Sequence, residues 1–148
     1  MTEFIQIITG AIGTLGFGIL FNVRGKKLAA VTAAGGVSWG IFITLCALGA
    51  SEVTAYLICA IGISVFAEIM ARALKAPATV FTTPSLIPFI PGSSLYYTLA
   101  YAFGKNFELF AEKALSTLSL ASALAIGVIT ASAMTSLVLK LVKRRSKN

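Results

Sequence analysis

Apolar residues occur along this chain in five long runs that polar residues separate. The runs cover about residues 4–23, 28–49, 53–74, 79–103 and 115–139. Each run has roughly the 20 residues or more that an α-helix needs to cross the hydrocarbon core of a bilayer. The pattern therefore predicts an all-α integral membrane protein of about five transmembrane helices. Residues 1–148 are expected to form a single membrane domain embedded in the lipid bilayer.

The fourth run differs from the others because prolines interrupt it. Pro84, Pro88 and Pro91 fall within eight residues, and each interior proline disrupts a helix at a cost of about 3 kcal/mol. The residue before a proline also avoids the helical conformation. We therefore expect residues 86–92 to be largely extended or irregular, and a new helix to start near Ser93. Irregular backbone at membrane depth must be covered by protein or water, so the break is expected to face the inside of the bundle.

A helix that restarts at this break presents free backbone N–H groups and the positive end of its dipole, which suits a carboxylate. Hydroxyl side chains precede the break, and tyrosines follow it. Gly92 is expected to let the backbone approach a ligand, and Ser93 to cap the restarted helix. A structural kink with an interfacial aromatic belt is the alternative interpretation. The candidate substrate-binding residues are Thr82, Thr83, Pro88, Pro91, Gly92, Ser93, Ser94, Tyr96 and Tyr97.

Glu68 is the only acidic residue inside an apolar run. It follows Ala60 and Ser64 in one i, i+4 row and precedes Arg72 by four residues, so its carboxylate is expected to face the bundle. One interpretation is an ion pair that neutralises a costly charge near the cytoplasmic interface. The other is a proton- or substrate-coupling site, because ionisable groups inside membranes tend to mark transport pathways.

Small residues recur every four positions in three of the runs. Such rows let helix backbones approach closely in lipid, which predicts a tightly packed bundle. A role in lining a pathway is the alternative. The rows are Gly10, Thr14 and Gly18; Thr32, Gly36, Gly40 and Thr44; and Ser119, Ala123, Gly127, Ala131 and Thr135.

Composition and charge agree with a membrane location. The chain has 57% hydrophobic and 11% charged residues, where a soluble domain carries about 25% charged residues. The net charge of +7 does not indicate nucleic acid, because the basic residues lie between the apolar runs rather than along a groove or stripe. Basic clusters at 24–27, 72–75 and 140–147 place the N-terminus outside and the C-terminus in the cytoplasm under the positive-inside rule. The first run is expected to be retained as a span, because Glu3 replaces the basic start of a signal peptide.

The sequence offers little other chemistry. It contains no histidine, and Cys46 and Cys59 lie within apolar runs, so we expect no metal and no cofactor. The two cysteines are interpreted as packing residues, with a disulfide between neighbouring helix ends as the alternative. There is no nucleophile with a nearby base, so an enzyme is not expected.

Residues 67–104, with the sequence AEIMARALKAPATVFTTPSLIPFIPGSSLYYTLAYAFG, resemble the threonine/serine exporter (ThrE) family, in particular its small-subunit, YjjB-like branch. The family pattern has an acidic and a basic residue at the end of one helix, a proline–alanine–threonine turn, and a proline–leucine–valine–proline–glycine core followed by a tyrosine. Phe89 and Ile90 stand where the family often has leucine and valine, and Ser93 where a second glycine is frequent. The matching residues are Glu68, Arg72, Pro77, Ala78, Thr79, Pro88, Pro91, Gly92 and Tyr96.

This resemblance implies the small membrane subunit of a two-component secondary exporter in a bacterial inner membrane. It implies a small carboxylate substrate, either threonine and serine or a dicarboxylate such as succinate. It also implies a larger exporter-family membrane subunit as partner. Because the chain has one proline motif and a midplane site usually needs two halves, a homo-oligomer or the larger subunit is expected to close the site. The competing hypothesis is an accessory or scaffolding membrane subunit that carries no substrate.

Overall fold

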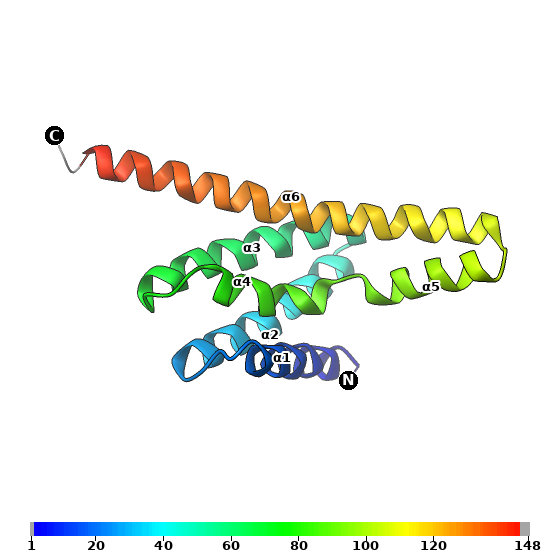
Figure 1. Ribbon diagram of the computed structural model, residues 1–148, viewed down its shortest axis with the longest axis horizontal. Coiled ribbons are helices and arrows are strands. Elements are labelled where there is room, and N and C mark those ends of the chain that lie inside the picture. Colours follow the sequence, from blue (N-terminus) through cyan, green and yellow to red (C-terminus); the bar gives the residue numbers. More distant parts are fainter. Residues whose placement is uncertain (1, 146–148) are drawn as a thin grey trace.

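The computed structural model describes the backbone of residues 2–145 and the side chains up to Val138. Every regular element in that part of the chain is a helix, which confirms the predicted all-α class (Figure 1). The elements are α1 (Thr2–Leu20), α2 (Lys26–Ala47), α3 (Glu52–Ala73), α4 (Thr79–Leu86), the 3-10 helix η1 (Ile87–Phe89), α5 (Gly92–Phe103) and α6 (Phe107–Arg145).

Four helices end in the same way, with one residue in the left-handed conformation. The residue after it returns its N–H to a carbonyl in the last helical turn, which satisfies a group that the helix leaves free. These bonds join Val23 to Gly18, Ala50 to Leu45, Ala76 to Ala71, and Asn106 to Tyr101. The left-handed residues are Asn22, Gly49, Lys75 and Lys105.

α1 and α2 pack against each other along their small-residue rows. A Cβ added at Gly35 would lie 2.6 Å from the Thr14 Cβ, and one added at Gly36 would lie 3.1 Å from the Ala11 Cβ. Thr14 is fully buried, and its hydroxyl donates to the Gly10 carbonyl at 2.8 Å. The two helices therefore approach closely because glycine and short side chains occupy the contact. Thr14 and Gly36 belong to the predicted rows, whereas the rows did not include Gly35 and Ala11.

α3 and α6 form a second close contact. A Cβ added at Gly127 of α6 would lie 2.6 Å from the Ala60 Cβ and 3.0 Å from the Leu57 carbonyl oxygen of α3. Ala123 and Ala131, from the same row of α6, are also buried. The two helices lie side by side and run in the same direction (Figure 1). The segment that joins them must therefore return along the bundle.

That return is made by α4, η1 and α5 together. Within the described residues, four helices are long and apolar enough to cross a membrane: α1, α2, α3, and α6 over Phe107–Val138. α4 has 8 residues and α5 has 12, so each is too short to span alone. The fourth of the five predicted transmembrane passes, which would run through this composite segment, stays a prediction.

The two cysteines are free thiols, so the disulfide alternative is not formed. Cys59 is buried, and its thiol donates to the Ser38 carbonyl at 3.5 Å, which fits a packing role. Cys46 is exposed on α2.

Candidate functional site

The fourth apolar run is broken where the prolines predicted a break, but the broken segment stays more helical than expected. Pro84 lies inside α4, and Pro91 is the residue that precedes α5. The prediction of largely extended backbone is wrong for residues 87–89, which form η1. Pro88 fits there because the first turn of a helix leaves its N–H groups without partners in any case. Only Ile90, which precedes a proline, is extended, with φ −64° and ψ 123°.

Helix α5 starts one residue earlier than predicted. It begins at Gly92, so Pro91 occupies the N-cap position, and that position makes no side-chain hydrogen bond to the helix. The prediction that Ser93 caps the restarted helix is therefore wrong. Ser93 lies inside the first turn and is exposed.

Phe89 anchors the break in the interior of the bundle. Its side chain is fully buried. The centroid of its ring lies 5.3 Å from that of Trp39, 6.0 Å from that of Phe42 and 5.8 Å from that of Tyr56. Two of these contacts are edge-to-face, which is a favourable geometry for aromatic pairs. A compact turn brings Phe89 into this cluster, which explains why residues 87–89 are not extended.

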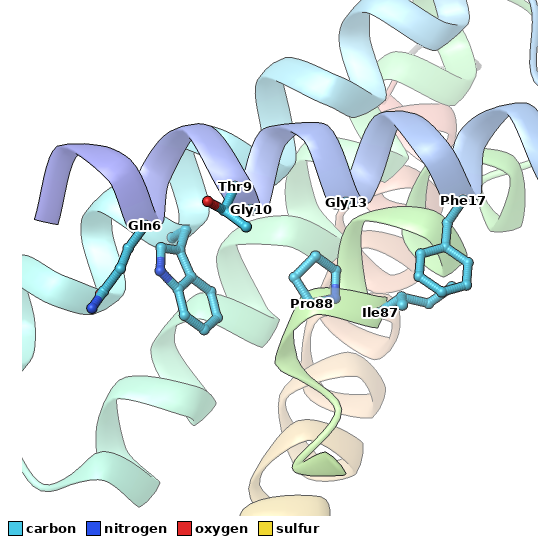
Figure 2. A pocket seen from close by; sticks show the side chains of 8 residues that line it. Gln6, Thr9, Gly10, Gly13, Phe17, Ile87 and Pro88 are labelled. Atoms are coloured by element: carbon cyan, nitrogen blue, oxygen red, sulfur yellow. The ribbon is translucent and has the colours of Figure 1, made fainter. Parts of the chain in front are cut away.

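A pocket of about 360 Å³ lies between α1, η1 and Trp39 of α2. Figure 2 shows α1 along one wall, with Gln6 near one end and Phe17 near the other, and Ile87 and Pro88 of η1 facing it. Gly10 and Gly13, near the middle of α1, have no side chains and so leave space for the pocket on this face of the helix. None of the lining residues carries a charge. The full lining is Gln6, Thr9, Gly10, Gly13, Phe17, Trp39, Ile87 and Pro88.

Of the predicted substrate-binding residues only Pro88 lines this pocket, and Gly10 lines it from the first small-residue row, for which a role in lining a pathway was the alternative. Gln6 and Thr9 are polar residues inside the first apolar run, and Trp39 is the only tryptophan of the chain. These three residues were the features of the sequence that could have indicated the pocket. That α1 lies beside η1 is a property of the fold, and no local pattern in the sequence indicates it.

The predicted residues before the break lie in a different place. Thr82 and Thr83 line a groove of about 460 Å³ between α4 and α6, opposite Leu124 and Val128. The Thr82 hydroxyl donates to the Ala78 carbonyl at 3.0 Å, a bond within its own helix. Ile87 lines both this groove and the pocket beside Pro88, but neither threonine lines that pocket.

The predicted residues after the break lie in a third place. Gly92, Tyr96 and Tyr97 are exposed at the start of α5, and a Cβ added at Gly92 would meet nothing within 4 Å. The Ser94 carbonyl accepts a bond from the Thr98 hydroxyl at 2.8 Å. This chain alone therefore does not gather the nine predicted residues into one enclosed site.

Glu68 and Arg72 form the predicted pair. The carboxylate accepts a bond from the guanidinium at 2.9 Å, and the guanidinium also donates to the Glu68 backbone carbonyl. The Glu68 side chain is 23% exposed and the Arg72 side chain 42%. The pairing is confirmed, and its part in coupling stays a prediction.

Three buried polar atoms in the described part of the chain have no hydrogen-bond partner. They are Trp39 Nε1, Ser64 Oγ and Ser85 Oγ. Ser64 is 2% exposed and Ser85 is fully buried, on the neighbouring helices α3 and α4. A buried polar group without a partner costs about 1–3 kcal/mol, so such atoms mark places where a water or another polar group would be stabilised. The sequence pattern placed Ser64 in the row of Glu68 but did not predict that its hydroxyl is buried without a hydrogen-bond partner.

Comparison with known proteins supports a transport role for this helical bundle. The model of a family described as "Threonine/Serine exporter, ThrE" matches residues 6–134, from α1 through most of α6. No solved structure was found to match the chain. The YjjB-like branch stays a prediction. This match extends over most of the chain and leads to one conclusion: the chain belongs to the threonine/serine exporter (ThrE) family.

Proposed function

We propose that this chain is the small membrane subunit of a two-component secondary exporter that carries small carboxylates across a bacterial inner membrane. Membership in the family supports transport of the threonine and serine type. A dicarboxylate such as succinate is the other substrate class. The observation that carries the proposal is the pocket of about 360 Å³ beside the broken fourth pass.

The size and position of this pocket suit a small substrate. Ligand sites usually have volumes of about 300–1,000 Å³ and lie where helices of a bundle meet. Gly10 and Gly13 are near the centre of α1, so the pocket is close to the middle of the expected span. Secondary transporters commonly bind substrate at this depth, beside a discontinuous helix.

The polar groups of the pocket fit an amino acid only in part. The Thr9 hydroxyl donates to the Ile5 carbonyl at 2.7 Å, so its oxygen remains available to accept a bond from an ammonium or hydroxyl group. The Gln6 amide can donate to a carboxylate. No lining residue is cationic, and a carboxylate at membrane depth is costly without compensation. We therefore assign the cationic or hydrogen-bond-donating groups that would balance the substrate carboxylate to the larger exporter-family subunit.

The exposed start of α5 supports the same arrangement. Gly92 and Ser93 are exposed, and a Cβ added at Gly92 meets nothing within 4 Å, so a substrate there would be enclosed only by another chain. In this proposal the small subunit supplies the broken helix and the pocket, and the larger subunit supplies the donors that the pocket lacks.

The test is flux of labelled threonine, serine and succinate from vesicles that contain the purified chain, with and without the larger subunit. We expect flux only when both subunits are present. Gly13→Leu should then lower flux at least about tenfold, because the new side chain fills the pocket; a tenfold loss corresponds to about 1.4 kcal/mol of binding free energy.

Gly16→Leu is the matched control. Both glycines lie on α1, and a Cβ added at either meets nothing within 4 Å, but only Gly13 lines the pocket. Full flux from the chain alone would overturn the two-component arrangement. Equal flux from both variants and the wild type would show that the substrate does not use this pocket, and would favour the accessory-subunit hypothesis.

A further inference from the structure

α5 and the first part of α6 extend beyond the ends of the other helices (Figure 1). Gly127 of α6 lies beside Leu57 and Ala60 of α3, and α3 begins at Glu52. Because α3 and α6 run in the same direction, the first residue of α3 is level with about Leu120. About 13 residues of α6 therefore extend past α3, a length of roughly 20 Å at 1.5 Å per residue.

We call α5 and this part of α6, residues 92–119, the α5–α6 hairpin. The Thr98 and Thr117 hydroxyls form a hydrogen bond of 3.2 Å across it, and Thr98 is 8% exposed. Among the described elements, α6 is the only helix with which α5 makes extensive contact. The side of α5 that faces away from α6 is therefore uncovered.

The uncovered side of α5 is a continuous apolar stripe. The exposed fraction is 47% for Leu95, 67% for Tyr96, 51% for Leu99 and 85% for Phe103. With Gly92, these residues stand at i, i+3, i+4, i+7 and i+11, which places them on one face of the helix. No residue of α5 carries a charge. We call this face the α5 stripe.

A flat bilayer does not cover the α5 stripe and the other helices at the same time. Glu52 marks the end of α3, whereas Lys105 and Glu108 mark the tip of the hairpin, roughly 20 Å farther along the bundle. That offset is about two thirds of the 30 Å hydrocarbon core. If Glu52 lies at the membrane surface, much of the stripe stands above the lipid. If the stripe lies in lipid, Glu52 is drawn inside, where a charge is expensive.

We propose that the α5 stripe packs against the α5 stripe of a second copy of this chain, about a twofold axis along the membrane normal. A copy in the same membrane orientation carries its hairpin at the same height, so each stripe covers the other along its whole length. The spacing of Gly92, Tyr96, Leu99 and Phe103 alternates four and three residues, as in the seam of a two-stranded coiled coil. The absence of charge in α5 also leaves no like-charge repulsion across the axis.

The proposal can be tested by cysteine cross-linking in native membranes, independently of transport. Cys46→Ala and Cys59→Ala first remove the two thiols of the chain. Leu99→Cys then places one thiol on the stripe, and Ile129→Cys places one on α6, where the native side chain is 67% exposed. A disulfide needs Cα atoms within about 7 Å. We expect oxidation to yield a covalent dimer with Leu99→Cys, at least tenfold more than with Ile129→Cys.

Equal yields from the two positions would indicate random collision and overturn the proposal. A cross-link from residue 99 to a different membrane protein, identified by mass, would also overturn it. If Leu99→Cys does not fold, Phe103→Cys provides the same test one turn farther along the stripe. A second measurement uses light scattering in detergent, where the wild-type chain should have twice the protein mass of Leu99→Arg. Identical monomer masses together with no cross-link would exclude the dimer.

Discussion

The pairing of Glu68 with Arg72 illustrates how a local contact can be predicted from spacing alone. Residues four apart on a helix face each other, and the structure places the two charged groups 2.9 Å apart. Both side chains are partly exposed, and an exposed pair four residues apart on a helix typically adds about 0.3–0.5 kcal/mol to the free energy of unfolding. The pair can therefore be broken without unfolding the bundle, which makes it open to a functional test.

Glu68→Gln keeps the shape of the side chain and removes its charge. We expect this variant to fold with a loss below about 1 kcal/mol. We also expect it to lose proton-linked efflux in vesicles that contain this chain and the proposed larger subunit, because the carboxylate is the only acidic group within an apolar run. The measurement is efflux against an imposed pH gradient. Normal efflux from Glu68→Gln, or recovery in a variant that also carries Arg72→Gln, would assign the carboxylate to charge balance alone.

Residues that depend on distant parts of the chain were harder to predict. The hydroxyls at Thr82 and Thr83 and the start of α5 are near the break in sequence, yet the fold sends them to different faces. Gln6 and Trp39 are far from the break in sequence, yet they share a pocket with Pro88. Ser93 does not cap α5 because the helix begins one residue earlier than predicted. Helix propensities do not locate a helix end to within one residue.

Among whole helices, the periodic small-residue rows predicted close packing, and the structure uses them at the α1–α2 and α3–α6 contacts, but the rows did not indicate which helices pair. The first residue of α6 was not predicted from the sequence. The apolar run begins near residue 115, whereas the helix begins at Phe107 and includes Glu108 and Glu112. Hydrophobicity reports which part of a helix suits lipid, and a helix continues beyond it as long as its backbone bonds are satisfied. The break was predictable from its prolines, but the tight turn at residues 87–89 depends on the burial of Phe89 by other helices.

The seam between α3 and α6 makes a direct prediction for stability. Gly127→Val should destabilise the protein by about 1–3 kcal/mol, because its Cβ would approach the Ala60 Cβ at 2.6 Å and a backbone oxygen at 3.0 Å. Gly62→Val on α3 is the control, since a Cβ there meets nothing within 4 Å. The measurement is the free energy of unfolding in mixed detergent, followed by circular dichroism. Equal stability of the two variants would contradict the close α3–α6 contact.

For the whole molecule, the structure gathers two of the three basic clusters at one end of the bundle. Residues 24–27 lie in the turn after α1 and the start of α2, residues 72–75 lie at the end of α3 and in the turn after it, and both turns lie at the same end (Figure 1). The third cluster, 140–147, has its side chains outside the described residues, so its place rests on the sequence. The N-terminus-outside, C-terminus-inside orientation remains a prediction.

Reporter fusions after Lys27, Lys75 and Asn148 test this orientation. All three should report from the cytoplasm, because positively charged loops are retained on that side of the inner membrane. The control is a fusion in the turn after α2, near Ala50, which should report from the periplasm. A periplasmic signal from any of the first three positions would contradict the predicted layout.

The parallel contact between α3 and α6 has a consequence for the order in which the protein is made. α1 and α2 are neighbours in sequence, so their seam can close as soon as both have left the ribosome. α3 must wait until Gly127 has been synthesised, and until then the surface around Leu57 and Ala60 is open to lipid or to other newly made helices. The α3–α6 contact therefore forms only after α6 has been made, and a chain that stops before α6 would retain the first seam while leaving α3 without its partner.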